Sequence, residues 1–127
     1  MKLGKVLGLA VVIALAGLAF WLWTPDRARA ELEVRYLENR ADLLDMGGFA
    51  LHVRDSGPKE APALIFLHGF GSSLHTWDGW AEKLAGSHRV VRLDLPGSGL
   101  SDPDPTGDYT DTRSHALILQ LMDKLAI

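Results

Sequence analysis

The chain has 127 residues and a formal net charge of −3 at pH 7. Its 47% hydrophobic and 23% charged residues are ordinary for a folded protein and exclude a disordered or collagen-like chain. The weak acidity provides no basic surface that would neutralise phosphates, so we expect no nucleic-acid partner. The lack of cysteine in the sequence excludes disulfides, thiolate nucleophiles, cysteine-bound zinc and lipid attachment at a cysteine.

The N-terminal segment is predicted to be a membrane helix. Residues 6–23 carry no charge, and as a helix they span about 27 Å, close to the ~30 Å hydrocarbon thickness of a bilayer. Lys2 and Lys5 precede this run, so the positive-inside tendency places the N-terminus in the cytoplasm. Trp21 and Trp23 end the run at the headgroup level. We therefore expect a single-pass anchor in a bacterial inner membrane, with the rest of the chain on the exported side.

A cleaved signal peptide is the alternative for this segment. The Ala-Arg-Ala sequence that ends at Ala30 matches a small-x-small cleavage pattern, and cleavage there would secrete the remainder. The apolar run is longer than the usual signal core of about 7–15 residues, which favours an uncleaved anchor. We assign residues 1–24 to the anchor, 25–40 to a charged, solvated juxtamembrane linker or helix, and 41–127 to a folded domain.

The domain is predicted to alternate strands and helices. Gly47 and Gly48 separate the runs 41–45 and 49–55, which indicates a β-hairpin whose second strand has one wet face. Strand, helix and strand in succession imply a right-handed parallel crossover, so the sheet is mixed. The elements after the hairpin are a strand at 63–67 that is buried on both faces, a helix at 77–85, a strand at 89–93, a loop at 94–108 and a helix capped by Thr110.

Two glycine-bearing loops follow the two predicted parallel strands. The sequence His-Gly-Phe-Gly occupies 68–71, and Asp-Leu-Pro-Gly-Ser-Gly-Leu-Ser occupies 94–101. Ligand sites of α/β sheets lie at the carboxyl ends of such strands. Glycines there allow sharp turns and leave N–H groups pointing into the crevice, which is what a developing oxyanion requires.

These two loops, with the hairpin before them, resemble the α/β-hydrolase superfamily over about residues 43–127. The flanking FGSSLHTWDGW, TPD and LEVRYLENR segments are similar to membrane-anchored bacterial α/β-hydrolases. The resemblance implies the α/β fold class. The chain would be the N-terminal part of an α/β-hydrolase fold. This fold has three layers, in which helices cover both faces of a mixed, mostly parallel sheet.

The resemblance also implies roles for individual residues. Phe70 is expected to supply a backbone N–H to the oxyanion hole. His75 and Trp77 are candidate substrate-pocket residues. The alternative for His75 is a position at the surface or at the start of a helix, and the alternative for Trp77 is a position in the core. The loop-shaping residues would be His68, Gly69, Gly71, Asp94, Gly97 and Gly99.

The nucleophile of the family stands in a G-x-S-x-G elbow and is followed in the chain by an acid and a histidine. The 127 residues contain no G-x-S-x-G, so we expect the elbow and the triad beyond Ile127, and an inactive chain in isolation. No metal or organic cofactor is implied. His52, His88 and His115 lack metal-ligand spacing and are expected at the core rim or surface.

The sequence thus predicts a full-length hydrolase that attacks a small-molecule ester or related carbonyl with a serine. Gly71 stands where relatives with an aspartate nucleophile tend to have proline, which favours serine over epoxide or haloalkane hydrolysis. Cofactor-free haloperoxidase-like enzymes and carbon–carbon bond hydrolases stay open. From a different class, a non-catalytic membrane-tethered product also stays open. The Gly97-x-Gly99 sequence does not predict a nucleotide-binding loop, because the third glycine and a following Lys-Ser/Thr are missing.

Overall fold

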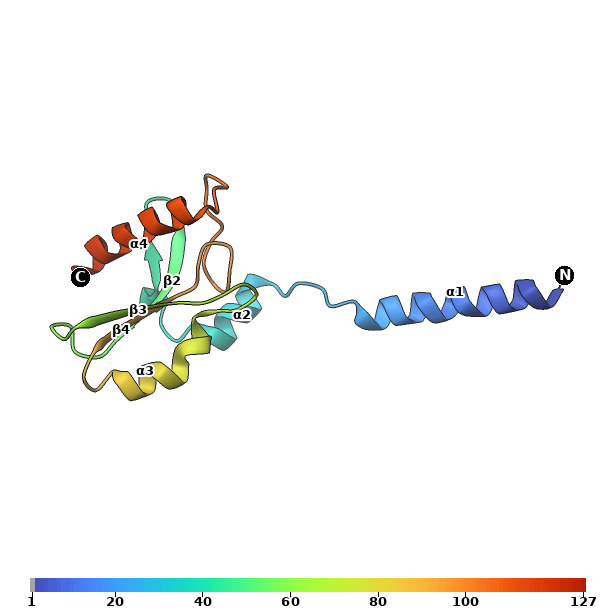
Figure 1. Ribbon diagram of the computed structural model, residues 1–127, viewed down its shortest axis with the longest axis horizontal. Helices are drawn as coiled ribbons and strands as arrows, with labels where there is room; N and C mark the ends of the chain where they lie inside the picture. The colour runs from blue at the N-terminus through green and yellow to red at the C-terminus, as the bar shows by residue number, and fades with distance from the viewer. Residues whose placement is uncertain (1) are drawn as a thin grey trace.

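The computed structural model describes residues 2–127, and side chains from residue 4 onward, so Met1 and the Lys2 side chain lie outside the described part. One long helix, α1, projects from a domain that contains all the other elements (Figure 1). In chain order the elements are α1 (Lys2–Leu22), α2 (Arg29–Tyr36), η1 (Arg40–Asp42), β1 (Leu43–Asp45), β2 (Ala50–Ser56), β3 (Ala63–Leu67), η2 (Leu74–Trp77), α3 (Asp78–Leu84), β4 (Arg89–Leu93) and α4 (Asp111–Leu125).

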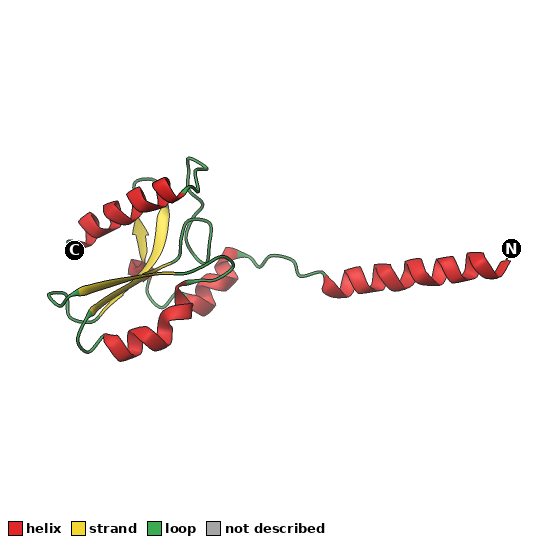
Figure 2. Ribbon diagram, viewed as in Figure 1, coloured by secondary structure: helices red, strands yellow, loops and turns green. Residues whose placement is uncertain are grey.

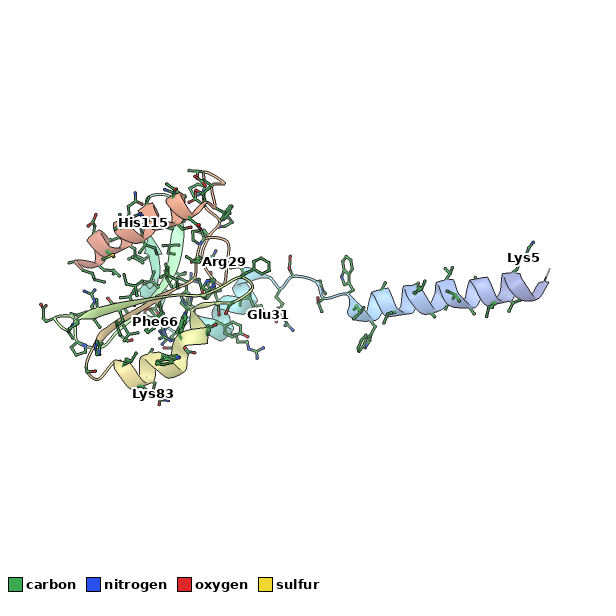
Figure 3. All side chains as sticks on the ribbon, in the orientation of Figure 1. Lys5, Arg29, Glu31, Phe66, Lys83 and His115 are labelled. Carbon is green, nitrogen blue, oxygen red and sulfur yellow. The ribbon has the colours of Figure 1, made fainter. Side chains whose placement is uncertain are left out.

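Helix α1 contains the apolar run noted in the sequence. Its span Gly4–Leu22 has a mean hydropathy of 2.2 and is long and apolar enough to cross a membrane. Its side chains project into open space, and those described are exposed along the whole helix (Figure 3). Length and composition fit a membrane span, and an N-terminal signal sequence meets the same criteria.

The four strands form one mixed sheet in the order β1-β2-β4-β3. Strand β2 is antiparallel to both β1 and β4, whereas β3 and β4 are parallel with Ile65 opposite Val91. The hairpin prediction is confirmed, because Gly47 and Gly48 have φ values of +89° and +109° between β1 and β2. The Asp45 carboxylate accepts both of their N–H groups at 3.1 Å, which holds the turn.

Helices cover both faces of the sheet (Figure 2). Helix α4 packs on one face. Its N-cap is Thr110, whose hydroxyl accepts the Arg113 N–H at 3.2 Å. On the other face η2 and α3 pack, with the Trp77 ring stacked on Phe66 at a centroid distance of 5.0 Å. The core beneath α4 consists of Phe49, Leu51, Val53, Val91, Leu93, Leu117 and Leu121. The three layers predicted for the fold are therefore present.

Strand β3 differs from the prediction that it is buried on both faces. Residues 63–66 are half-buried, and Leu67 is 43% exposed. Among the described residues only β4 pairs with β3, so β3 lies at an edge of the sheet. Strand β4 lies between two neighbours and is buried at all five positions.

The prediction of a wet face on β2 is wrong. His52, which belongs to that face, has no exposed surface. Its ring contacts Asp94 and lies 6.3 Å from the ring of His75, because η2 and the loop after β4 cover this side of the strand. The residue is therefore a buried polar group and not a rim or surface histidine.

The juxtamembrane segment contains a helix, one of the two forms expected, and none of the residues of α2 is buried. Helix α2 lies against the domain, where Arg29 donates to the carbonyl of Leu100 at 2.9 Å and pairs with Asp102. Within α2 an i,i+4 ion pair joins Arg29 to Glu33 at 2.9 Å. Charge pattern alone described a helix but not the surface on which it packs.

Candidate functional site

The loops after β3 and β4 lie side by side, because the two strands are parallel neighbours and end at the same edge of the sheet. Together with the start of α4 they line a cavity of about 400 Å³. Residues 68–71 form one wall and residues 95–98 another. Tyr109 and Leu117 add apolar surface to the lining. The position matches the site expected from the sequence.

His68 ties the two loops together. It is buried, and its Nε2 accepts the backbone N–H of Leu95 at 3.0 Å. Its Nδ1 lies 2.8 Å from the carbonyl of Gly69, so the proton must sit on Nδ1. Because both ring nitrogens are engaged, His68 holds loop geometry and has no free nitrogen for proton transfer to a substrate.

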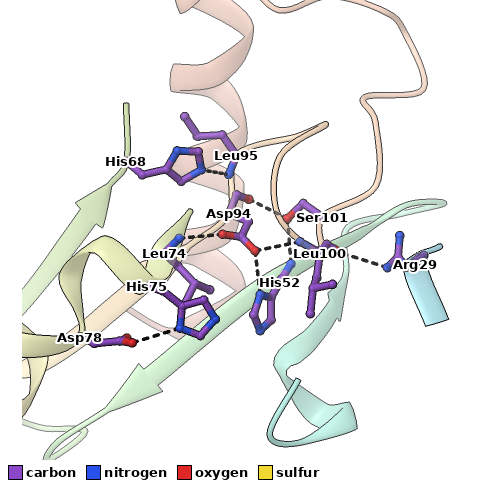
Figure 4. A network of polar contacts seen from close by, with 10 residues as sticks. All are labelled: Arg29, His52, His68, Leu74, His75, Asp78, Asp94, Leu95, Leu100 and Ser101. Atoms are coloured by element: carbon purple, nitrogen blue, oxygen red, sulfur yellow. Dashed lines mark hydrogen bonds and ion pairs between the residues drawn. The ribbon is translucent and has the colours of Figure 1, made fainter. Parts of the chain in front are cut away.

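The Asp94 carboxylate is the centre of a buried polar network (Figure 4). One oxygen accepts the Leu74 N–H at 2.7 Å. The other accepts the Leu100 N–H at 2.9 Å and contacts His52 Nδ1 at 2.8 Å. Burial raises the pKa of Asp94, but these hydrogen bonds outweigh it and the pKa is lowered overall. An ionised carboxylate with both oxygens occupied pins the loop and has no free oxygen for acid–base work.

Ser101 and His52 complete this network, and sequence reasoning gave neither a role in it. The Ser101 hydroxyl donates to the Asp94 carbonyl at 2.6 Å and accepts the His52 N–H at 2.9 Å. The contact between His52 and Asp94 depends on the antiparallel register of β2 and β4, which sets Val53 opposite Leu93. No local pattern reports that register, because the two residues are 42 positions apart.

Glycine is required at position 99 by both backbone and space. Gly99 has a φ of +53°, and a Cβ there would lie 2.1 Å from an Asp94 carboxylate oxygen. Gly71, in the other loop, has a φ of +67° but no atom within 4 Å of the same position. At Gly99 the loop after β4 is therefore packed closely against the Asp94 carboxylate, whereas at Gly71 the loop after β3 borders open space.

Phe70 lines the cavity, and its side chain is fully exposed. Within residues 2–127 no protein group accepts a hydrogen bond from its backbone N–H. The donor is thus free to meet a ligand atom at the carboxyl end of β3. Its role in an oxyanion hole stays a prediction.

An ion pair at the cavity rim escaped sequence reasoning, which described 94–108 only as a loop. Asp104 contacts Arg113 of α4 at 2.7 Å and lines the cavity. The Thr106 hydroxyl and N–H donate to the same carboxylate at 2.5 and 2.8 Å. The Thr106 hydroxyl, then Arg113, lower the pKa of Asp104 to about 2. The Asp-x-Thr spacing, which is typical of a local side-chain turn, was the available signal.

The structure does not bring His75 and Trp77 to this cavity. His75 pairs with Asp78 at 3.1 Å and lines a smaller cavity of about 110 Å³ beneath α2. Trp77 stacks on Phe66 on the α3 side of the sheet. Across the described residues, no three His, Asp or Glu side chains are placed to hold a metal ion.

A protein-family model described as "alpha/beta hydrolase fold" matches residues 62–127, which include both loops, β3, β4 and α4. The chain belongs to this family. The α/β-hydrolase assignment agrees with the mixed sheet and with the position of the cavity at the carboxyl ends of β3 and β4.

Individual α/β-hydrolase relatives cover several activities. The chain is 40% identical over 55 residues to the 2-succinyl-6-hydroxy-2,4-cyclohexadiene-1-carboxylate synthase of Salmonella agona (strain SL483). The match covers 43% of this chain and 21% of the relative. It is similar to a structure of novel epoxide hydrolases from metagenomes of hot environments, with a TM-score of 0.58 and 37% identity over 63% of this chain and 27% of that chain.

A third relative is the enol-lactonase of Burkholderia xenovorans LB400. Its structure matches with a TM-score of 0.58 and 34% identity, over 64% of this chain and 32% of that chain. The chain spans about a fifth of the length of the curated relatives it matches. The names of these relatives indicate different activities on similar chains.

Proposed function

We propose that the full-length protein containing this chain hydrolyses a small-molecule ester or related acyl compound with a serine nucleophile. The observation that carries the proposal is the free N–H of Phe70 at the wall of a 400 Å³ cavity, on a loop held in place by His68. A backbone donor at the carboxyl end of a parallel strand suits the oxygen of a tetrahedral intermediate. The similarity to an enol-lactonase supports a carbonyl substrate.

The reaction would follow the acyl-enzyme route. The serine oxygen attacks the carbonyl carbon while a histidine takes the hydroxyl proton, and the carbonyl oxygen becomes an oxyanion. The Phe70 N–H donates to that oxyanion beside a second donor after the nucleophile. Collapse expels the alcohol, which takes the proton from histidine. Water then repeats the sequence and releases the carboxylic acid. One oxyanion donor contributes about 3 kcal/mol of transition-state stabilisation.

A second candidate is supported by the 37% identity to epoxide hydrolases. In that case an aspartate at the elbow attacks a carbon of the epoxide, the ring C–O bond at that carbon breaks, and the freed oxygen takes a proton from an acidic group of the full-length protein. Water then hydrolyses the resulting ester, which releases the diol and restores the aspartate. The two candidates share the Phe70 loop and differ in the nucleophile. Gly71, where relatives with an aspartate nucleophile tend to have proline, favours the serine candidate.

The proposal includes an anchor. Helix α1 would hold the protein in a bacterial inner membrane, with Lys5 on the cytoplasmic side and the domain outside. The exposure of every described α1 side chain supports a lipid environment for this helix. Carbonate extraction and N-terminal sequencing test the anchor: an integral protein with α1 intact is expected, and a soluble form that begins after Ala30 would mean a cleaved signal.

The nucleophile is tested on the full-length protein. A fluorophosphonate probe is expected to label one serine covalently, with loss of hydrolysis of 4-nitrophenyl esters. A protein that resists the probe and incorporates ¹⁸O from water into an aspartate during turnover of an epoxide would establish the second candidate instead. A protein with neither reaction on any ester or epoxide would contradict both.

A further inference from the structure

We infer that the cavity faces the membrane surface and that the substrate is an amphiphilic acyl ester that partitions into the bilayer. The inference rests on the anchored hydrolase proposed above. It is carried by the way in which the chain enters the domain from α1, which no sequence pattern indicated.

The connection between anchor and domain is short. Helix α1 ends at Leu22 and α2 begins at Arg29, so residues 23–28 join them. Fully extended, six residues reach at most about 20 Å. With Trp21 and Trp23 at the headgroup level, Arg29 therefore stays within about 20 Å of the membrane interface.

Helix α2 is attached to the domain at the loop that follows β4. Arg29 pairs with Asp102 and donates to the Leu100 carbonyl at 2.9 Å. Leu32 and Tyr36, farther along α2, line the small cavity against η2, and the Tyr36 ring lies 5.6 Å from that of His75. Arg29 at its start, and Leu32 and Tyr36 farther along, thus attach the helix to this surface.

The attachment point adjoins the catalytic cavity. The carbonyl of Asp102 accepts the N–H of Gly97 at 3.0 Å, and Gly97 lines the cavity. In Figure 1 the carboxyl ends of β3 and β4 and the loops after them lie on the side of the domain from which α1 departs. The short connection thus holds the rim of the cavity near the bilayer and leaves the opposite side of the sheet away from it.

The cavity lining suits an acyl chain. Leu95, Pro96, Tyr109 and Leu117 supply apolar surface beside the free donor of Phe70. An ester with a long chain concentrates in the bilayer, within reach of a tethered site, whereas a short-chain ester gains nothing from the tether. Membrane-borne acyl esters are therefore the substrate class that this arrangement favours.

The test uses the full-length protein reconstituted in phosphatidylcholine vesicles, with 4-nitrophenyl butyrate as the soluble ester and 4-nitrophenyl palmitate as the bilayer-borne one. A twenty-residue Gly/Ser spacer inserted after Asp26 adds about 25 Å of average reach. It is expected to lower kcat/KM for palmitate at least about fivefold and to leave butyrate unchanged. The matched control replaces residues 24–26 with Gly-Ser-Gly at constant length and is expected to keep the wild-type ratio.

A second pair of variants tests the attachment of α2. Arg29→Ala removes the contacts to Asp102 and Leu100, and is expected to lower palmitate hydrolysis relative to butyrate. Arg27→Ala removes only the exposed pair with Glu31 and is expected to change nothing. An unchanged palmitate-to-butyrate ratio in both the spacer and Arg29 variants overturns the inference. If the wild-type protein hydrolyses neither the butyrate nor the palmitate ester, the proposed function is overturned, and the inference with it.

Discussion

In the loop after β4, Asp94 and Ser101 are buried and their polar atoms are bonded, whereas in the loop after β3 Phe70 is fully exposed and its N–H is free. Both loops contain glycines in the left-handed region. At Gly99 a side chain would collide with a carboxylate, while at Gly71 it would enter open space. The same residue type therefore serves packing in one loop and accessibility in the other.

The contrast teaches how the site is divided. The loop after β4 acts as a frame, since its hydrogen bonds reach β2, η2 and the loop after β3 through His52, Leu74 and His68. The loop after β3 carries Phe70, which is exposed and whose N–H has no protein acceptor among the described residues. A substitution in the frame is expected to lower stability, and one at the donor to lower activity. The following predictions test this division on the full-length protein.

The largest effect is expected from Asp94→Ala. The substitution leaves the buried N–H groups of Leu74 and Leu100 and the ring of His52 without an acceptor. We expect a loss of about 3–5 kcal/mol in the free energy of unfolding, measured by urea denaturation. Asp94→Asn retains one acceptor oxygen and is expected to lose less. A loss below about 1 kcal/mol for Asp94→Ala would show that this loop is not the frame.

Phe70→Pro removes the free N–H and is the corresponding test of the donor. We expect kcat for a 4-nitrophenyl ester to fall about 10²–10³-fold, with KM and the free energy of unfolding little changed. Phe70→Leu keeps the N–H and is the control, which is expected to retain kcat within a small factor. Equal losses in both variants would assign the effect to the side chain and contradict the oxyanion role.

A pair of glycine substitutions compares the loops directly. Gly99→Ala forces a Cβ into the Asp94 carboxylate at positive φ and is expected to lose about 2–4 kcal/mol of stability. Gly71→Ala meets only the backbone penalty and is expected to lose about 1 kcal/mol. Thermal or urea unfolding measures both. Similar losses at the two positions would remove the contrast between the loops.

The smallest effect concerns Asp104 and is measured as a loss of stability in acid. Its pKa is lowered to about 2 in the folded state, against about 3.9 in an unfolded chain. The unfolded state then binds more protons near pH 3, so this contribution to stability is present above pH 4 and is lost as pH falls towards 2. Asp104→Asn keeps an oxygen for Thr106 and should flatten the stability curve between pH 4 and 2. An unchanged slope would contradict this contribution.

Local patterns predicted much of the fold. The bounds of β3 and β4 follow from two apolar runs, and the hairpin follows from Gly47-Gly48. The order of these elements and the two glycine loops sufficed to identify the α/β-hydrolase family. The position of the cavity could also be predicted, because parallel neighbouring strands end at one edge of the sheet.

Other features could not be predicted because they depend on residues far apart in the chain. The burial of His52 requires the register of β2 on β4 and the cover provided by η2. For His75 the sequence left a substrate-pocket position open beside a surface or helix-start position; the residue lies at the start of η2 and faces α2.

The sequence by itself determined the apolar α1, the strands, and the two loops with Phe70 at the end of β3, because periodicity and glycine placement are local properties. Only the tertiary structure decided that Asp94 anchors its loop and that Arg29 attaches α2 beside the cavity. Hydrogen bonds between distant segments set these positions, and their partners are chosen by sheet register and by packing. The direction in which the cavity opens relative to α1 is therefore a property of the folded chain.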